Sequence, residues 1–369
     1  MRVCKTWYTL GCPFLYEYII LGRTRVLAPL RDGLSRAALE NRQVGRWTER
    51  LDVRMRDATK TPETVFATLA DILTYLPNLC ILTFSIAGRG FFSASLPNVV
   101  LNSITSSGSL KCVQWYNSFT KPLPHPWTEF LQKHPEIEVL DGGQAVTLNA
   151  HIRMDAVKIL HGYPIRTWNW AVWSDVDLPA VRSIFYDLTY GIEADDANIF
   201  TQLGQNLTNI QLSFFVPLRV PCLNVVFARF REGCPRLAQL VLAVRSWSML
   251  GSYTLNLPST VHTLGIRVSD GEVSAASVKR LFTALLPLCV ARNHALKTIK
   301  FMDASNSRAL RSRPISLWHG LRVTENLGVA VTDFHDRLIV PPSCPGVVHL
   351  QRQLDKLSFT SILDAYHPT

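Results

Sequence analysis

Residues 234–244 read CPRLAQLVLAV, and the fold class that the sequence predicts rests on this short phrase. Its apolar anchors are Leu237, Leu240 and Leu242, which follow the pattern L-x-x-L-x-φ, where φ is a large apolar residue. The second and third anchors are two residues apart, so in a strand their side chains point to the same face of the sheet. The phrase therefore predicts a short strand with one apolar face that another element must cover.

The same phrase recurs along the chain at irregular intervals. Good copies have the anchors Leu79/Leu82/Phe84, Leu110/Val113/Trp115, Leu207/Ile210/Leu212, Val261/Leu264/Ile266 and Leu296/Ile299/Phe301. Looser copies occur at Ile137/Leu140, Val157/Leu160 and Ile165/Trp168/Trp170, and an early one lies in residues 47–53. A single copy carries no information, but a series of copies indicates a repeating structural unit.

Helical stretches separate the copies. Residues 61–76 begin with Thr61 as N-cap and Pro62 at the first helical position, and apolar residues follow at helical spacing. Residues 178–190, 223–233 and 274–293 have similar patterns and predict further helices. Helix, break and short strand in alternation predict an α/β fold, an irregular leucine-rich-repeat solenoid whose units bury one another's apolar faces.

The alternative is a doubly wound α/β domain, in which strands also alternate with helices. That alternative predicts near-continuous Val/Ile strands and a glycine-rich phosphate loop. Residues 88–90 (GRG) follow a strand pattern but lack the third glycine and lead into Phe91 and Phe92. We therefore expect the solenoid over residues 44–340, with a helical segment before it at 1–43 and a tail or cap at 341–369.

The first residues form a different kind of segment. Residues 3–21 read VCKTWYTLGCPFLYEYIIL, a helix-period pattern interrupted by Gly11 and Pro13. This segment resembles the last part of an F-box in fungal F-box proteins, which have a V-C-[KR]-x-W helix, a small-residue turn and an L-Y-x-x-[IV] segment. Residues 45–53 resemble the link to the repeats in those proteins, and LPNLCILTFSI (76–86) and CPRLAQLVLAV resemble their leucine-rich repeats.

The resemblance implies a substrate-recognition subunit of a cullin–RING ubiquitin ligase. In that family the F-box binds a Skp-type adaptor and the repeats bind the protein to be ubiquitylated. The positions that match the motif, and would contact the adaptor, are Val3, Cys4, Trp7, Leu15 and Tyr16. The chain departs from the pattern because it starts with only the final F-box helix, so we expect a short helical F-box remnant. The alternative is a stand-alone scaffold for protein–protein interaction, in which residues 1–20 only cap the solenoid.

Charge and aromatic residues suggest where a protein substrate would bind. The chain has 38 Lys and Arg against 28 Asp and Glu, and residues 1–60 hold 12 basic side chains against six acidic ones. Such an excess could attract nucleic acid or an acidic protein face, but no nucleic-acid-binding motif accompanies it, so we expect a solvated helical surface rather than a nucleic-acid site. Trp and Arg dominate binding energy at interfaces, and Trp173 and Trp247 lie past the strand anchors. Arg245 and Arg267 lie beside anchors of neighbouring copies, where they would stack into a basic ladder facing an acidic partner. For Trp173 and Trp247 the competing interpretation is partial exposure without binding, whereas Trp168 and Trp170 match the apolar anchors and are expected to fill the core.

The sequence contains no recognisable catalytic or metal-binding motif. Walker A, G-x-S-x-G, H-E-x-x-H and paired Cys/His zinc spacings are missing from the sequence. The eight cysteines form no C-x-x-C pair, and the chain opens with no signal-peptide pattern. We therefore expect a non-enzymatic protein without cofactor, metal or membrane association, in the reducing environment of the cytoplasm or nucleus.

Overall fold

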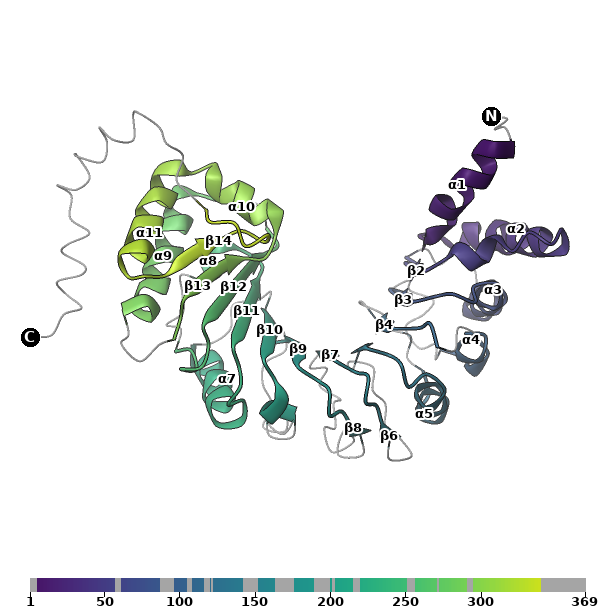
Figure 1. Ribbon diagram of the computed structural model, residues 1–369, viewed down its shortest axis with the longest axis horizontal. Helices are drawn as coiled ribbons and strands as arrows, with labels where there is room; N and C mark the ends of the chain where they lie inside the picture. The colour runs from purple at the N-terminus through teal and green to yellow at the C-terminus, as the bar shows by residue number, and fades with distance from the viewer. Residues whose placement is uncertain are drawn as a thin grey trace, which may run out of the picture. The chain divides into compact units, whose positions relative to one another are not determined.

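The strands of the protein assemble mainly into one parallel sheet. The computed structural model describes residues 5–56, 61–86, 96–104, 108–115, 120, 122–141, 152–162, 176–188, 200, 203–214, 220–250, 256–270, 272–290 and 295–339 (Figure 1). Twelve strands form an open sheet in the order β1-β2-β3-β4-β5-β7-β9-β10-β11-β12-β13-β14, and β6 pairs with β8. Contacts divide the chain into two compact units. Unit 1 comprises Met1–Ser213 and Ala228–Leu237, and unit 2 comprises Phe214–Phe227 and Ala238–Thr369.

Unit 1 contains the first strands and their helices. Its strands are β1 (Tyr18–Leu21), β2 (Arg50–Val53), β3 (Ile81–Phe84), β4 (Cys112–Trp115), β5 (Val139–Asp141), β6 (Ile152–Arg153), β7 (Ile159–Gly162), β8 (Val176–Asp177), β9 (Ser183–Asp187) and most of β10 (Asn209–Phe214). Its helices are α1 (Lys5–Glu17), α2 (Leu27–Leu39), α3 (Pro62–Thr74), α4 (Asn98–Asn102) and α5 (Pro124–Lys133), with short 3₁₀ turns η1 (Thr24–Val26), η2 (Val44–Trp47) and η7 (Gly204–Asn206).

Unit 2 contains the last four strands. These are β11 (Gln239–Val244), β12 (Thr263–Val268), β13 (Thr298–Phe301) and β14 (Ala330–Thr332). The helices α8 (Trp247–Leu250), α9 (Ala275–Val290), α10 (Ala304–Arg311) and α11 (Pro314–Asn326) belong to this unit, and α7 (Val220–Gly233) is divided between the two units. Over the stretches described above, no helix combines the length and apolar character needed to cross a bilayer.

This architecture corrects the expected fold class. We expected an irregular leucine-rich-repeat solenoid preceded by a helical F-box remnant, whereas the described residues form an open, all-parallel α/β sheet of 12 strands with helices. Within the expected helical segment, residues 18–21 form the strand β1, which pairs with β2 in this sheet. The physical reason is that the strand phrase encodes a strand with one face covered by a helix. Any parallel sheet packed against helices has this requirement.

Several predicted elements are confirmed, and one is wrong. The six good copies of the phrase all contain strands, and α3, α7 and α9 lie at three predicted helices. The predicted helix at 178–190 is instead β9, in which Ile184 and Tyr186 are buried at strand spacing. Hydrogen bonding to both β7 and β10 stabilises this strand over its helical pattern. The expected cap at 341–369 lies outside the described residues.

The core of unit 1 lies between the sheet and a row of helices. Helices α2 to α5 lie on one side of β2 to β5, and each helix packs against the next (Figure 1). The third anchor of the phrase points toward this core. The rings of Phe84 and Trp115 are 5.2 Å apart, those of Trp115 and Trp127 are 5.0 Å apart, and those of Trp127 and Phe130 are 5.1 Å apart. These stacked and edge-to-face aromatic pairs fix the sheet against α5.

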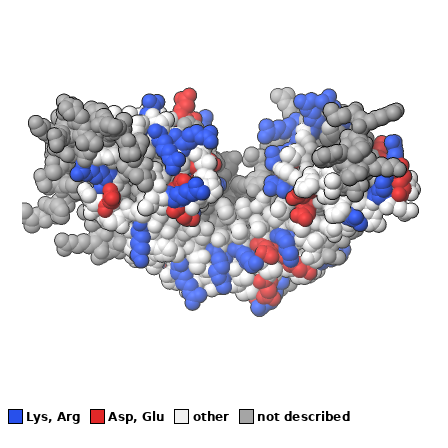
Figure 2. All heavy atoms as spheres, turned by 45° about the horizontal axis from the view of Figure 1, so that its top comes forward, with Lys and Arg blue, Asp and Glu red and all other residues white. Residues whose placement is uncertain are grey.

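Basic and acidic side chains lie side by side in several places on the surface that Figure 2 presents. In unit 1 the ion pairs include Arg31–Asp32 at 2.8 Å and Lys158–Glu138 at 2.7 Å. Arg42 pairs with Glu40. Part of the basic excess of residues 1–60 is therefore neutralised locally.

Candidate functional site

The face of the unit 1 sheet that points away from α2–α5 carries most of its polar strand residues. We call it the distal face and define it by Tyr18, Ile20, Arg50, Asp52, Ile81, Thr83, Gln114, His161 and Phe185. Register explains this grouping, because Arg50 lies beside Tyr18 and Ile81, and Asp52 lies beside Ile20 and Thr83. Residues paired across parallel strands share a face, so the alternation within each strand determines which side chains gather there.

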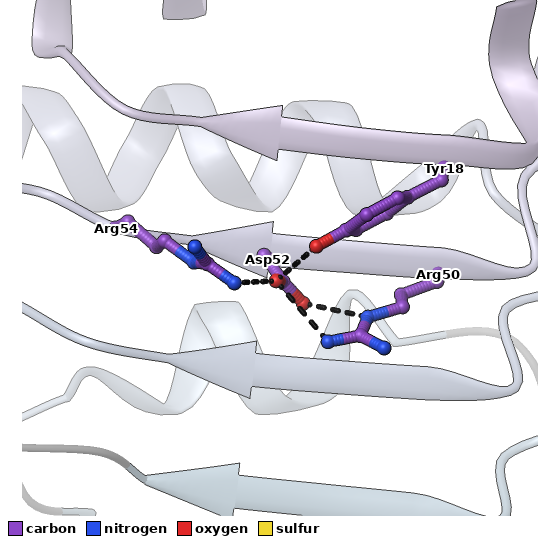
Figure 3. A network of polar contacts seen from close by, with 4 residues as sticks. All are labelled: Tyr18, Arg50, Asp52 and Arg54. Carbon is purple, nitrogen blue, oxygen red and sulfur yellow. Dashed lines mark hydrogen bonds and ion pairs between the residues drawn. The ribbon is translucent and has the colours of Figure 1, made fainter. Parts of the chain in front are cut away.

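Asp52 is the centre of a polar network at the N-terminal end of the distal face (Figure 3). The Tyr18 hydroxyl donates to Asp52 Oδ2 at 2.6 Å, and Arg54 Nη2 donates to the same oxygen at 2.6 Å. Arg50 Nε donates to Oδ1 at 3.0 Å, and Arg50 Nη2 donates to Oδ2 at 3.3 Å. One carboxylate thus holds a phenol and two guanidinium groups from β1, from β2 and from the residue that follows β2.

Burial and hydrogen bonding shift the pKa of Asp52 in opposite directions. The side chain is fully buried, and burial alone would raise its pKa. Hydrogen bonds from Arg50, Tyr18 and Arg54 outweigh burial, so the pKa of Asp52 lies below its usual range. The hydrogen bond to Asp52 correspondingly raises the pKa of the Tyr18 phenol. Asp52 is therefore a permanent anion at neutral pH, and Tyr18 remains a neutral donor.

The groups around Asp52 remain accessible to a partner. The side chains of Arg50 and Arg54 are 42% and 51% exposed, and Tyr18 and Ile20 are exposed large residues of the edge strand β1. The Arg50 guanidinium lies 4.8 Å from the centre of the Tyr18 ring, a cation–π contact that orients both side chains. Beside Asp52, the Thr83 hydroxyl is buried and has no hydrogen-bond partner among the described residues. The network thus presents two oriented cations and two apolar side chains to solvent.

A second group lies further along the distal face. The Gln114 amide nitrogen lies 3.2 Å from His161 Nε2, and the His161 ring stacks on Phe185 at 4.4 Å between ring centres. Burial lowers the pKa of His161 to about 4. The imidazole is therefore neutral at physiological pH, and its stacked ring forms part of a flat aromatic surface.

The expected adaptor-binding residues lie partly outside the described residues. Val3 and Cys4 are not described, and of Trp7 only its place in α1 is described. Leu15 is 74% exposed, and Tyr16 is partly buried. The same helix exposes Leu10 and Phe14, so α1 presents an apolar surface, while the buried Cys12 lies on the same helix.

The described residues among those expected to bind a substrate differ in exposure and in register. Trp173 lies outside the described residues. Arg245 is exposed and Arg267 partly so, but the register pairs Arg267 with Ala243, two positions before Arg245. Arg245 and Arg267 are therefore not paired across the two strands, and the expected arginine ladder is not formed by this register. Trp247 is 1% exposed and its ring lies 5.9 Å from that of Phe301, so this side chain is in the core and does not offer a surface contact.

Sequence reasoning missed the network around Asp52, although part of its signal is present. In residues 50–54 (RLDVR), charged and apolar side chains alternate, which places Arg50, Asp52 and Arg54 on one face of a strand. The participation of Tyr18 depends on the pairing of β1 with β2, which the local sequence does not encode. Among the described residues, no group of three or more His, Cys, Asp or Glu side chains is placed to hold a metal ion.

We compared the chain with known protein families and with curated proteins. No family model and no curated protein matches it.

Proposed function

We propose that the chain is a non-enzymatic protein-binding module that acts as a substrate-recognition subunit of a cullin–RING ubiquitin ligase. In this proposal, α1 and its neighbouring residues bind a Skp-type adaptor. The distal face of unit 1 receives the protein to be ubiquitylated. The proposed compartment is the cytoplasm or nucleus, where such ligases act.

The observation that carries the proposal is the exposed apolar surface of residues 10–20. Leu10, Phe14 and Leu15 in α1 are 60%, 79% and 74% exposed, and Tyr18 and Ile20 in β1 are also exposed. Leu10 and Phe14 are four residues apart and therefore lie on the same side of the helix. Contiguous exposed apolar side chains mark interaction surfaces because their exposure to water is unfavourable. This surface belongs to the segment whose sequence resembles an F-box.

A binding measurement with a purified Skp-type adaptor tests the proposal. We expect the chain to bind the adaptor in isothermal titration calorimetry, and the double substitution Phe14→Ser and Leu15→Ser to weaken binding at least tenfold, about 1.4 kcal/mol. The matched control is Val225→Ser, which removes an exposed apolar side chain from α7. If the unsubstituted chain does not bind, or if Val225→Ser weakens binding as much as the double substitution, adaptor binding through α1 is refuted.

One observation favours a second function, a scaffold for protein–protein interaction that does not join a ligase. Helix α1 packs against η2, and Cys12 is buried on it, as expected of a helix that caps the end of the sheet. A scaffold would bind its protein partner through the distal face and would show no affinity for the adaptor. The same titration therefore separates the two functions.

A further inference from the structure

The network around Asp52 carries an unbalanced positive charge. Arg50 and Arg54 contribute two cations, and the Asp52 carboxylate contributes one anion. Both guanidinium groups form their ion pairs with Asp52 and with no other carboxylate among the described residues. The neighbours that share its face, Ile20 and Thr83, are uncharged. One positive charge therefore remains on an accessible part of the distal face.

The two arginines also retain unused donors. A guanidinium group has five N–H donors. Arg50 uses Nε and Nη2 toward Asp52, and Arg54 uses Nη2. Nη1 of Arg50, and Nε and Nη1 of Arg54, donate to no described acceptor. Because Asp52 is fully buried and holds both side chains in place, these donors are oriented before a ligand arrives, which lowers the entropic cost of binding.

The chemistry of these groups favours a carboxylate over a phosphate. A single carboxylate would neutralise the remaining positive charge and accept hydrogen bonds from the guanidinium groups in a bidentate manner. A phosphate group carries about two negative charges at neutral pH, so it would leave an excess negative charge close to the Asp52 anion. Repulsion by Asp52 therefore selects for the singly charged group.

The surroundings of the arginines indicate what else the ligand contains. Tyr18 and Ile20 lie on the same face and are exposed, and they belong to β1, the edge strand of the sheet. An apolar side chain next to the carboxylate would cover them. Aromatic and arginine side chains together are the residue types that contribute most to protein interfaces.

We propose that Arg50 and Arg54 form a binding subsite for Asp or Glu side chains of a protein partner, with Tyr18 and Ile20 contacting adjacent apolar residues. This proposal rests on the proposed protein-binding function and adds the class of partner segment, an acidic and apolar peptide. Asp52 is a positioning residue in this subsite, because it orients the arginines and lowers their net charge.

Fluorescence anisotropy with short labelled peptides tests the subsite. The probe is a capped pentapeptide in which two glutamates alternate with three leucines. The matched probes replace the glutamates with glutamines or with phosphoserines. We expect the glutamate peptide to bind the full chain, with an affinity that falls as salt is added, and the glutamine peptide to bind at least tenfold more weakly. The phosphoserine peptide should bind no more tightly than the glutamate peptide.

Variants of the chain locate the binding. Arg50→Gln with Arg54→Gln should weaken binding of the glutamate peptide at least tenfold, about the effect of losing one charge-assisted contact. The matched control is Arg36→Gln, which removes the same charge from an exposed position on α2 and should leave affinity within about twofold. Asp52→Asn should raise the affinity of the phosphoserine peptide relative to that of the glutamate peptide, because it removes the anion that repels the doubly charged group. Loss of arginine orientation alone would weaken binding of both peptides alike and would leave this ratio unchanged.

Three results would overturn the subsite. These are equal binding of the glutamate and glutamine peptides, equal losses in Arg36→Gln and the double variant, and tighter binding of the phosphoserine peptide. If the double variant does not fold, Arg54→Gln alone decides, since Asp52 then keeps Tyr18 and Arg50 as donors. The Phe14→Ser and Leu15→Ser variant should bind the peptide normally. Loss of adaptor binding and loss of peptide binding are therefore distinguishable failures.

Discussion

Replacing Asp52 by alanine should destabilise unit 1 by about 2 kcal/mol. Asp52 accepts hydrogen bonds from Tyr18, Arg50 and Arg54. A hydrogen bond to a charged group contributes about 1.5–3 kcal/mol to stability. Here the donors are about half exposed, so water replaces part of each lost contact, and alanine also avoids the cost of burying a carboxylate. These corrections bring the net loss to about 2 kcal/mol.

A second substitution, Asp52→Asn, separates the charge of the Asp52 side chain from its shape. Asp52→Asn preserves shape and one acceptor oxygen, but its amide N–H groups would face the donors of Arg50 and Arg54. We therefore expect Asp52→Asn to lose about as much stability as Asp52→Ala. Both variants are measured by urea unfolding followed by tryptophan fluorescence and circular dichroism. Asp32→Ala is the control, because Asp32 forms an exposed ion pair with Arg31 and should cost less than about 1 kcal/mol.

The pH dependence tests the charge of Asp52 directly. Its pKa in the folded protein is lowered, whereas an unfolded Asp has a pKa of about 3.9. The stabilisation is therefore fully present above the unfolded pKa and is lost as the pH falls through the folded pKa. The stability difference between the unsubstituted chain and Asp52→Ala should shrink over that acidic range. A difference that does not change with pH, or a fully stable Asp52→Asn variant, would refute the ionic account of this network.

Three further predictions concern the fold around the site. Gly45→Ala should destabilise the chain by more than about 2 kcal/mol in urea unfolding, because an added Cβ would overlap the backbone carbonyl oxygen of Tyr75. The control is Gly33→Ala, at an exposed helical position with open space, which should be neutral or stabilise the chain by up to about 1 kcal/mol. Equal effects at the two glycines would contradict the close approach of η2 to α3. Trp115→Ala should cost about 3–5 kcal/mol, because it removes a fully buried ring from an aromatic stack, and a loss below about 1 kcal/mol would contradict that packing. The folded chain should lose stability as the pH falls from about 6.5 to about 4, because His161 takes up a proton in the unfolded chain but not in its buried, folded position. In urea unfolding at several pH values, the stability of His161→Gln should depend less steeply on pH over this range. An unchanged slope would argue against the lowered pKa of His161.

Sequence patterns predicted secondary structure best where the conformation of a segment depends mainly on its own residues. The alternation of anchors in the strand phrase predicts strands at 81–84, 239–244 and 263–268, and the structure has strands there. Thr61 and Pro62 predict the start of α3 for a similarly local reason. Local patterns were less informative for residues 183–187, whose helix-like spacing is overridden by pairing on both sides. They also indicated an exposed or partly exposed Trp247, whose side chain lies in the core.

For the good copies of the strand phrase, the sequence by itself determined which residues form strands and which side of each strand is apolar, because strand geometry repeats every two residues. From RLDVR it also determined that Arg50, Asp52 and Arg54 share a face. Only the tertiary structure decided that β1 lies beside β2, which brings Tyr18 to a carboxylate 34 residues away. The physical reason is that alternation specifies the face of a strand. The neighbours of a strand and its register depend on how the helices between strands pack.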